Sequence, residues 1–284
     1  MNPINAPQQN KAKQFYDLHK GQNVLVLPNA WDPSSARLLE LAGFQAIGTT
    51  SAGIAHSLGY AEPEKMSREE MLLSIKRIVD VVSLPVSADI EAGYADTAEG
   101  VSDTIQLVIT TGAVGANIED SPGLDGNALL DLKNQVERLQ AAREAANSSQ
   151  LHFVINARTD IYLFNIGEPN TQLNQVIERA NHYLAAGADC VFIPGIGDSN
   201  IIARLVREIH GPINILANPN VPNTMELQRL GVKRVSTGSG PMRATLALVR
   251  QIANELFLEG TYNNFTANSI PYNEVNALFL QGKT

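Results

Sequence analysis

Short apolar runs rich in β-branched residues recur along the chain, and each is followed by a turn and then by a helical pattern. The runs are almost continuously apolar, as expected for strands of a parallel sheet that are buried on both faces. This alternation favours an α/β fold built on a parallel sheet. Eight such runs are present, at Val24–Pro28, Gln45–Thr50, Val86–Ile90, Gly115–Glu119, His152–Ala157, Asp189–Pro194, Ile213–Ala217 and Lys233–Thr237.

The segments between these runs carry the start and stop signals of helices. Asp32 followed by Pro33 is typical of an N-cap with proline in the first turn, and Ser67 with Glu70 predicts a capping box. Eight parallel strands joined by right-handed helical crossovers close most simply into a barrel, so we predict a (β/α)8 TIM-type barrel. A doubly wound open sheet is the alternative. Four glycines that can end a helix in the left-handed conformation stand before strand runs, at Gly43, Gly112, Gly187 and Gly231.

The length of the chain, 284 residues, fits one barrel of roughly 250 residues with a short extension. We predict a barrel over residues 1–259 and a C-terminal helical extension over residues 260–284. The extension is polar at first and ends in a short apolar helical segment that does not connect two predicted strands. Packing on a neighbouring subunit and folding onto its own barrel are both compatible with this sequence.

Composition restricts the classes of partner. Hydrophobic residues make up 44% and charged residues 18%, which is ordinary for a soluble globular core. The formal net charge is −8 without any basic run, which argues against nucleic acid and membrane surfaces as partners. The chain shows neither a secretory signal nor an apolar stretch of the roughly 20 residues that span a membrane. A single cysteine, Cys190, excludes an intrachain disulfide, so we expect a cytoplasmic protein.

Acidic side chains follow two neighbouring predicted strands, at the barrel face where active sites of this fold lie. Asp89 and Glu91 end the third strand and Glu119 ends the fourth. Residues two apart on a strand share a face, so Asp89 and Glu91 are expected to point into the barrel and join Glu119 in a cluster. Such a cluster repels itself unless a cation holds it, and hard oxygen ligands suit Mg²⁺ or Mn²⁺. The alternative is that these acids cap helices or pair with arginines.

Three further features near strand ends are candidates for substrate binding. Arg158 follows the fifth strand and can bind a carboxylate bidentately, or it can form a structural ion pair with Glu91 or Glu119. The small, hydroxylated turn over residues 50–53 offers backbone N–H groups to an anion. Trp31, the only tryptophan, either walls a pocket or belongs to the core.

At these residues the chain resembles the isocitrate lyase and phosphoenolpyruvate mutase superfamily, over about residues 30–260. The matching segments are LPNAWDPSSARLLELAGFQAIGTTSAG, SADIEAGYAD, NIEDS, INARTD and STGSGPMRA. The resemblance implies a Mg²⁺-dependent (or Mn²⁺-dependent) carbon–carbon lyase or decarboxylase. Its substrate is expected to be a small α-keto or α-hydroxy carboxylate that reacts through a pyruvate-type enolate. The resemblance also implies a homo-oligomer, a dimer or tetramer, that exchanges C-terminal helices.

The resemblance also assigns roles to individual residues. Asp89 and Glu91 match the metal-binding motif, although Glu91 stands where the family has aspartate, and Glu119 joins them as a metal ligand. The expected catalytic residues are Asp89, Glu119 and Arg158. Glu62 likewise stands where aspartate is more usual. The expected substrate-binding residues are Trp31, Ser51, Ala52, Gly53, Glu62 and Asn218.

The loop after the fourth strand departs from the family. Carbon–carbon lyases of the family carry Lys-Lys-Cys-Gly-His or Lys-Arg-Cys-Gly-His there, and the phosphonate enzymes carry Lys and Asn-Ser. Residues 119–127 read EDSPGLDGN, without Cys, His or Lys. Decarboxylation of an oxaloacetate-like acid needs no acid or base from this loop, whereas a retro-aldol cleavage would have to use Glu119, Glu62 or Tyr94. The alternatives are a phosphonopyruvate-type P–C bond enzyme and a non-catalytic α-keto acid binder.

Overall fold

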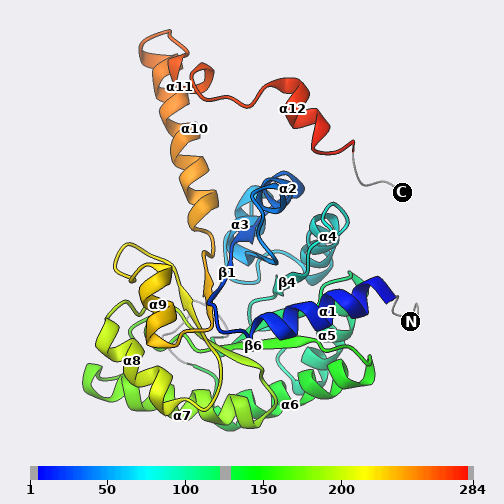
Figure 1. Ribbon diagram of the computed structural model, residues 1–284, viewed down its shortest axis with the longest axis vertical. Helices are drawn as coiled ribbons and strands as arrows, with labels where there is room; N and C mark the ends of the chain where they lie inside the picture. The colour runs from blue at the N-terminus through cyan, green and yellow to red at the C-terminus, as the bar shows by residue number, and fades with distance from the viewer. Residues whose placement is uncertain (1–5, 122–128, 281–284) are drawn as a thin grey trace.

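A computed structural model of the protein describes residues 6–121 and 129–280. One parallel sheet forms the centre of the molecule, and helices cover its outside (Figure 1). The strands are β1 (Leu25–Leu27), β2 (Asn29–Ala30), β3 (Ile47–Thr49), β4 (Val86–Asp89), β5 (Gly115–Glu119), β6 (Val154–Arg158), β7 (Cys190–Ile193), β8 (Ile213–Leu216) and β9 (Arg234–Ser236). The helices are α1 (Ala6–Leu18), α2 (Pro33–Leu41), α3 (Ser51–Ser57), α4 (Arg68–Val79), α5 (Ala98–Thr110), α6 (Leu132–Ser148), α7 (Pro169–Ala185), α8 (Ser199–Glu208), α9 (Thr224–Leu230), α10 (Gly240–Leu258), α11 (Asn263–Thr266) and α12 (Tyr272–Ala277).

The sheet closes through its first strand position. Strands β1 and β2 share this position on either side of Pro28, which has no backbone N–H to contribute to the ladder. β1 pairs with β9 through Leu25 and Arg234, whereas β2 pairs with β3 through Asn29 and Gly48. The strand order is β1-β9-β8-β7-β6-β5-β4-β3-β2, so the short link between β1 and β2 completes the barrel. The predicted TIM-type barrel is confirmed, and the open-sheet alternative is wrong.

The helix caps and helix-ending glycines predicted from the sequence are found at the expected residues. Asp32 caps α2, and Ser67 with Glu70 forms a capping box at the start of α4. These caps satisfy backbone N–H groups that have no partner inside the helix. The predicted glycines close the helical segments with positive φ angles of 90°, 94°, 108° and 96° at Gly43, Gly112, Gly187 and Gly231.

Helix α1 packs against the beginning of the barrel strands. Phe15 of α1 is fully buried, and its ring lies against Gly115, the first residue of β5. A Cβ atom on Gly115 would approach the Phe15 ring to 2.9 Å, so this packing requires glycine. The amino end of the sheet is therefore filled by α1, and the functional residues collect at the carboxyl end.

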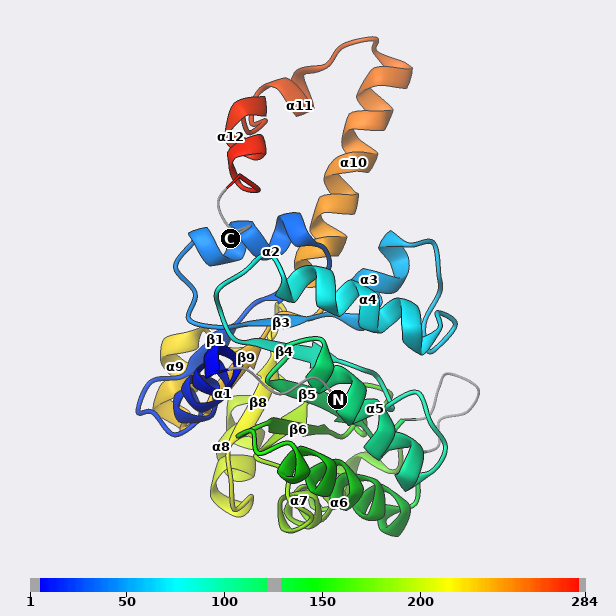
Figure 2. The same ribbon diagram turned by 90° about the vertical axis from the view of Figure 1, so that its right-hand side faces the viewer.

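The chain leaves the barrel after β9. Helix α10 projects from the barrel, and the C-terminal arm, residues 259–280, turns back toward α2 (Figures 1 and 2). Glu255 fixes the turn by accepting from the backbone N–H of Asn263 at 2.5 Å. At the other end of the arm, Arg37 Nε of α2 donates to the carbonyl of the buried Leu278 at 2.9 Å. The predicted domain boundary at 259/260 falls between α10 and α11. Across the described residues, no helix combines the length and apolar character needed to cross a membrane.

Candidate active site

A cavity of about 200 Å³ lies at the carboxyl ends of β3 to β6. Its apolar lining residues are Pro63, Leu163 and Phe164. The polar lining residues are Ser51, Glu62, Glu91, Glu119, Ser121 and Arg158. Because all strands of a parallel barrel end at the same face, residues from distant segments meet here.

Asp89 ends β4 directly beside this cavity and is held by three hydrogen bonds to its carboxylate. Oδ2 accepts from the backbone N–H of Ser51 at 3.0 Å and from its hydroxyl at 2.9 Å. Oδ1 accepts only from Asn117 Nδ2, at 3.2 Å, among the described residues. The backbone N–H of Asp89 also donates to Thr49 Oγ1 at 2.8 Å. The carboxylate is therefore oriented, and Oδ1 keeps a lone pair that no described residue uses.

Glu91 reaches the cavity by a different route from the one expected. β4 ends at Asp89, and Glu91 lies in the following turn with a positive φ of 52°, so the two acids do not share a strand face. Its carboxylate accepts from the Glu64 backbone N–H at 2.7 Å and from the Tyr94 hydroxyl at 2.8 Å. Burial raises the pKa of Glu91 to about 7, although these hydrogen bonds oppose the shift.

Arg158 is clamped between two carboxylates. It lies opposite Glu119 in the register of β5 and β6, and its Nη1 is 2.7 Å from Glu119 Oε2. Its Nε donates to Asp160 Oδ1 at 2.7 Å. Burial would lower the pKa of Arg158, but the charges of Glu119 and Asp160 outweigh it and raise the pKa. Nη2 has no hydrogen-bond partner among the described residues, so this edge of the guanidinium is available to a ligand.

The cavity holds more negative than positive charge. Burial raises the pKa of Glu62, and it raises the pKa of Glu119 well above its usual range while Arg158 opposes that shift. Together with Asp89, Glu91 and Asp160, these groups place five carboxyl groups around the guanidinium of Arg158. Protons or a bound cation must therefore balance the site.

Four of the predicted substrate-binding residues lie outside the described lining of this cavity: Trp31, Ala52, Gly53 and Asn218. Trp31 packs beside Gly53, where an added Cβ would come within 2.8 Å of the Trp31 Cβ. Ala52 is the second residue of α3, and Asn218 follows β8 with its side chain donating to the Leu216 carbonyl. Ser51 and Glu62 do line the cavity.

The loop that departs from the family is described only at its two ends, because residues 122–128 lie outside the described residues. At its start, Asp120 accepts from the Tyr183 hydroxyl at 2.7 Å and from Arg179 Nη1 at 3.3 Å. At its end, the Leu130 N–H donates to the Asp120 carbonyl at 2.8 Å, and Arg179 Nη2 donates to the Leu130 carbonyl at 3.0 Å. Arg179 of α7 thus binds both ends of the loop.

The oxygen-rich lining fits a hard cation that keeps part of its water shell, but it does not supply enough protein ligands to surround the cation completely. Within residues 6–121 and 129–280, no group of three or more His, Cys, Asp or Glu side chains is placed to hold a metal ion. Mg²⁺ usually keeps several waters and takes only one or two carboxylates directly. The free lone pairs of Asp89, with Glu91 and Glu119 nearby, match that requirement.

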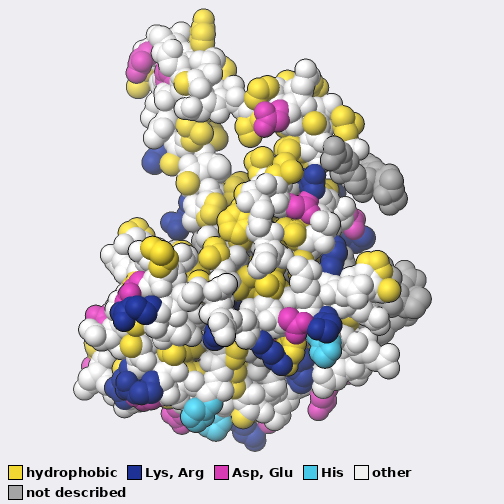
Figure 3. Space-filling view, in the orientation of Figure 1, with side chains coloured by type: hydrophobic (Ala, Val, Ile, Leu, Met, Phe, Trp, Pro, Cys, Tyr) yellow, Lys and Arg dark blue, Asp and Glu magenta, His cyan; other side chains and the backbone are white. Residues whose placement is uncertain are grey.

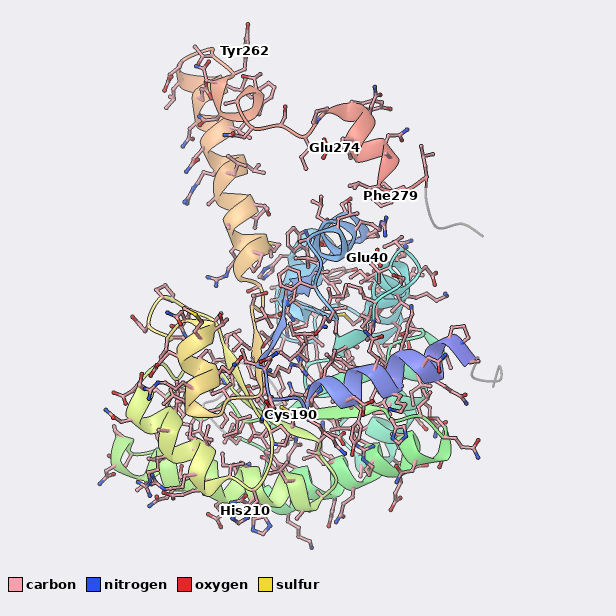
Figure 4. The ribbon with its side chains drawn as sticks, viewed as in Figure 1. Glu40, Cys190, His210, Tyr262, Glu274 and Phe279 are labelled. Atoms are coloured by element: carbon pink, nitrogen blue, oxygen red, sulfur yellow. The ribbon has the colours of Figure 1, made fainter. Side chains whose placement is uncertain are left out.

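Cys190 takes no part in the cavity. It lies on β7 inside the barrel wall (Figure 4), and burial raises its thiol pKa to about 12. A thiol with this pKa is protonated at neutral pH and is a poor nucleophile.

Several residues of the site were missed by the sequence interpretation. Asn117, Asp160 and Glu64 hold Asp89, Arg158 and Glu91, respectively. Asn117 had a usable signal, since it alternates with Glu119 on β5 and so faces the same way. Asp160 ends the INARTD segment, two residues after Arg158, and this spacing alone does not indicate that the two side chains pair. Leu163 and Phe164 follow the strand end in a turn, and no sequence pattern marked them.

Comparisons with known proteins agree on one family. A family model described as phosphoenolpyruvate phosphomutase matches residues 15–257. The sequence is 30% identical to 2-methylisocitrate lyase of Escherichia coli, over 84% of this chain and 82% of that protein. It is 30% identical to oxaloacetate decarboxylase of Pseudomonas entomophila, over 74% and 72%. A solved structure from Burkholderia cenocepacia, described provisionally as a lyase/mutase, has a TM-score of 0.90 and 37% identity, covering 97% of both chains.

Proposed function

The chain belongs to the phosphoenolpyruvate phosphomutase family, and from this premise we propose that it is a Mg²⁺-dependent lyase or decarboxylase of a small α-keto or α-hydroxy carboxylate. The reaction would pass through a pyruvate-type enolate. One observation carries the proposal: Arg158 lies in a cavity ringed by carboxyl groups, where an anionic substrate and a cation can be bound together.

Asp89 is the residue best suited to hold Mg²⁺ directly. Its Oδ1 accepts a single hydrogen bond and its Oδ2 is anchored by Ser51. Glu91 and Glu119, which also accept from the Glu64 N–H and from Arg158, would act through water, because Mg²⁺ usually takes only one or two carboxylates directly. When bound, Mg²⁺ would supply Lewis-acid polarisation of the keto oxygen of the substrate.

Arg158 would bind and orient the substrate anion. Of its five N–H donors, one on Nη1 and the one on Nε are used by Glu119 and Asp160. The remaining donors form a planar edge that matches a carboxylate or an enolate oxygen. Because both clamping carboxylates are buried, the guanidinium is held in place before substrate binds. Its charge can therefore stabilise the enolate more than the ground state.

The placement of proton donors favours decarboxylation over retro-aldol cleavage. Loss of CO₂ requires no proton transfer from the protein when the bond breaks. The Tyr94 hydroxyl is already donated to Glu91 Oε1, so it is not a free acid. Oxaloacetate-like acids are accordingly the first substrates to test.

We expect the protein to release CO₂ from oxaloacetate with Mg²⁺ and to lose this activity in EDTA. The measurement is a panel assay with oxaloacetate, 2-methylisocitrate and phosphonopyruvate, each corrected for spontaneous decay. Cleavage of phosphonopyruvate alone would favour the P–C bond alternative. Calorimetric binding of oxalate without turnover of any of the three acids would contradict the enzyme proposal and favour a binding protein.

We further propose that the protein forms a homo-oligomer through α10 and the C-terminal arm. Phe257 is 89% exposed and Leu258 is 74% exposed at the end of α10. Apolar side chains also gather where α10 leaves the barrel (Figure 3). Such a surface on a projecting helix is costly in water unless a second copy covers it.

Replacing Phe257 and Leu258 together with aspartate should convert a dimer or tetramer into a smaller species. The measurement is size-exclusion chromatography with light scattering. The matched control is Met225→Asp on α9, which is 79% exposed and lies away from the arm. A wild-type protein that is monomeric at micromolar concentration would refute the proposed assembly.

We also propose a cytoplasmic location, which the single, buried and unpaired thiol of Cys190 supports.

A further inference from the structure

A fully buried arginine lies inside the barrel, away from the cavity lining. Arg234 begins β9 with 0% exposure, and its guanidinium lies 5.9 Å from the centroid of the Phe15 ring. No carboxylate among the described residues forms an ion pair with it. Nε and Nη1 have no hydrogen-bond partner in the described structure. A buried charge with this little compensation is expensive, so stability alone does not account for it.

The one side-chain hydrogen bond that Arg234 forms with the described residues leads toward the site. Arg234 Nη2 donates to Asn117 Oδ1 at 3.3 Å, and Asn156 Nδ2 donates to the same oxygen at 2.7 Å. On its other side, Asn117 Nδ2 donates to Asp89 Oδ1 at 3.2 Å. Asn117 therefore connects the buried arginine with the carboxylate at the end of β4.

The chemistry of arginine fixes the orientation of this amide. A guanidinium offers only donors, so Asn117 must turn its oxygen toward Arg234. Its NH₂ group then faces Asp89, which offers only acceptors when ionised. The reverse orientation would set the amide oxygen against the carboxylate and the NH₂ group against two donors. Without Arg234, the Asn117 oxygen is held only by Asn156 among the described residues, and Asn156 can itself turn over because its Oδ1 has no described partner.

We infer that Arg234 is a positioning residue, which acts through Asn117 to orient Asp89 Oδ1 for the cation. This inference rests on the proposed function, because it assumes that Asp89 binds the metal. Ser51 anchors Oδ2, so Asn117 decides how Oδ1 is presented. Outer partners of metal ligands typically contribute a factor of about 10 to 100 in metal affinity.

The test is the affinity for Mn²⁺, measured by electron paramagnetic resonance of the free ion, without any substrate. Arg234→Met should raise the Kd for Mn²⁺ about tenfold. Arg234→Lys should recover part of the loss, because an ammonium group also only donates. Asn117→Leu should raise the Kd similarly, and adding Arg234→Met to it should change little more, since both act through one contact.

Arg143→Met is the matched control. Arg143 of α6 is partly buried and pairs with Asp189 at 2.5 Å, on the outside of the barrel. The Arg143→Met protein loses this ion pair, so its melting temperature should fall while its affinity for Mn²⁺ stays unchanged. If wild-type protein bound no Mn²⁺, the proposed function and this inference would both fail. If wild type bound Mn²⁺ and the Arg234 and Asn117 variants bound it equally well, only this inference would be overturned.

Discussion

Asp89→Ala is expected to abolish the metal-dependent binding of oxalate. The substitution removes Oδ1, the oxygen best placed to bind a cation, and it also releases Ser51 from its two hydrogen bonds. Loss of a group that only hydrogen-bonds to a metal ligand typically lowers metal affinity about 10-fold to 100-fold. Loss of the ligand itself should therefore lower it more than about 100-fold. Calorimetry with oxalate in the presence of Mg²⁺, and again after EDTA, measures the effect.

Asp80→Ala provides the comparison for this experiment. Asp80 forms an exposed ion pair with Lys76 just after α4, and such pairs contribute at most about 1 kcal/mol to stability. The control should bind oxalate as wild type does. Wild-type oxalate affinity in the Asp89→Ala protein, still sensitive to EDTA, would remove Asp89 from the metal site.

Arg158→Lys is expected to lower kcat/KM by about 100-fold to 1000-fold, the usual effect of losing a preorganised donor to a developing oxyanion. A lysine has a single charged nitrogen, which cannot contact Glu119, Asp160 and a substrate carboxylate in the bidentate geometry of arginine. The positive charge remains, so the two buried carboxylates keep a counterion and the fold should persist. Steady-state kinetics and oxalate calorimetry on the same sample separate catalysis from binding.

Arg143→Lys is the control for this substitution, because Arg143 pairs with Asp189 away from the cavity. The Arg143→Lys protein should keep kcat/KM within about twofold of wild type, because the substitution is conservative and lies away from the cavity. If Arg158→Lys kept both the oxalate affinity and kcat/KM of wild type, Arg158 would have only the structural role of an ion pair with Glu119.

The barrel could be predicted because its signals are local. Each predicted strand run overlaps an observed strand, although Arg158 proved to be the last residue of β6 rather than the first residue after it. Caps such as Asp32 and Ser67, and glycines with positive φ such as Gly43, act through neighbouring residues only. Helix–strand alternation then leaves few ways to connect a parallel sheet.

The site could be predicted in part for a related reason. A parallel barrel carries all its strand ends to one face, so the positions of Asp89, Glu119 and Arg158 after their strands predict that they lie near one another. The individual contacts were not predictable in the same way. Glu91 reaches the cavity from a turn with positive φ, not from the strand face that its spacing with Asp89 suggested. Leu163 lines the cavity from a turn, and the hydrophobic periodicity that predicts helices and strands does not predict where a turn residue points.

The sequence by itself determined the type of fold, and it predicted the face of the candidate site and the carboxylates and arginine that the structure places around the cavity. Only the tertiary structure decided how these groups are held: Arg158 between Glu119 and Asp160, and Asp89 through Asn117 to Arg234. Asn117 and Arg234 are 117 positions apart in the chain. Local patterns report which face a residue takes, but a contact of this kind exists only after the barrel closes and brings distant strands into one core.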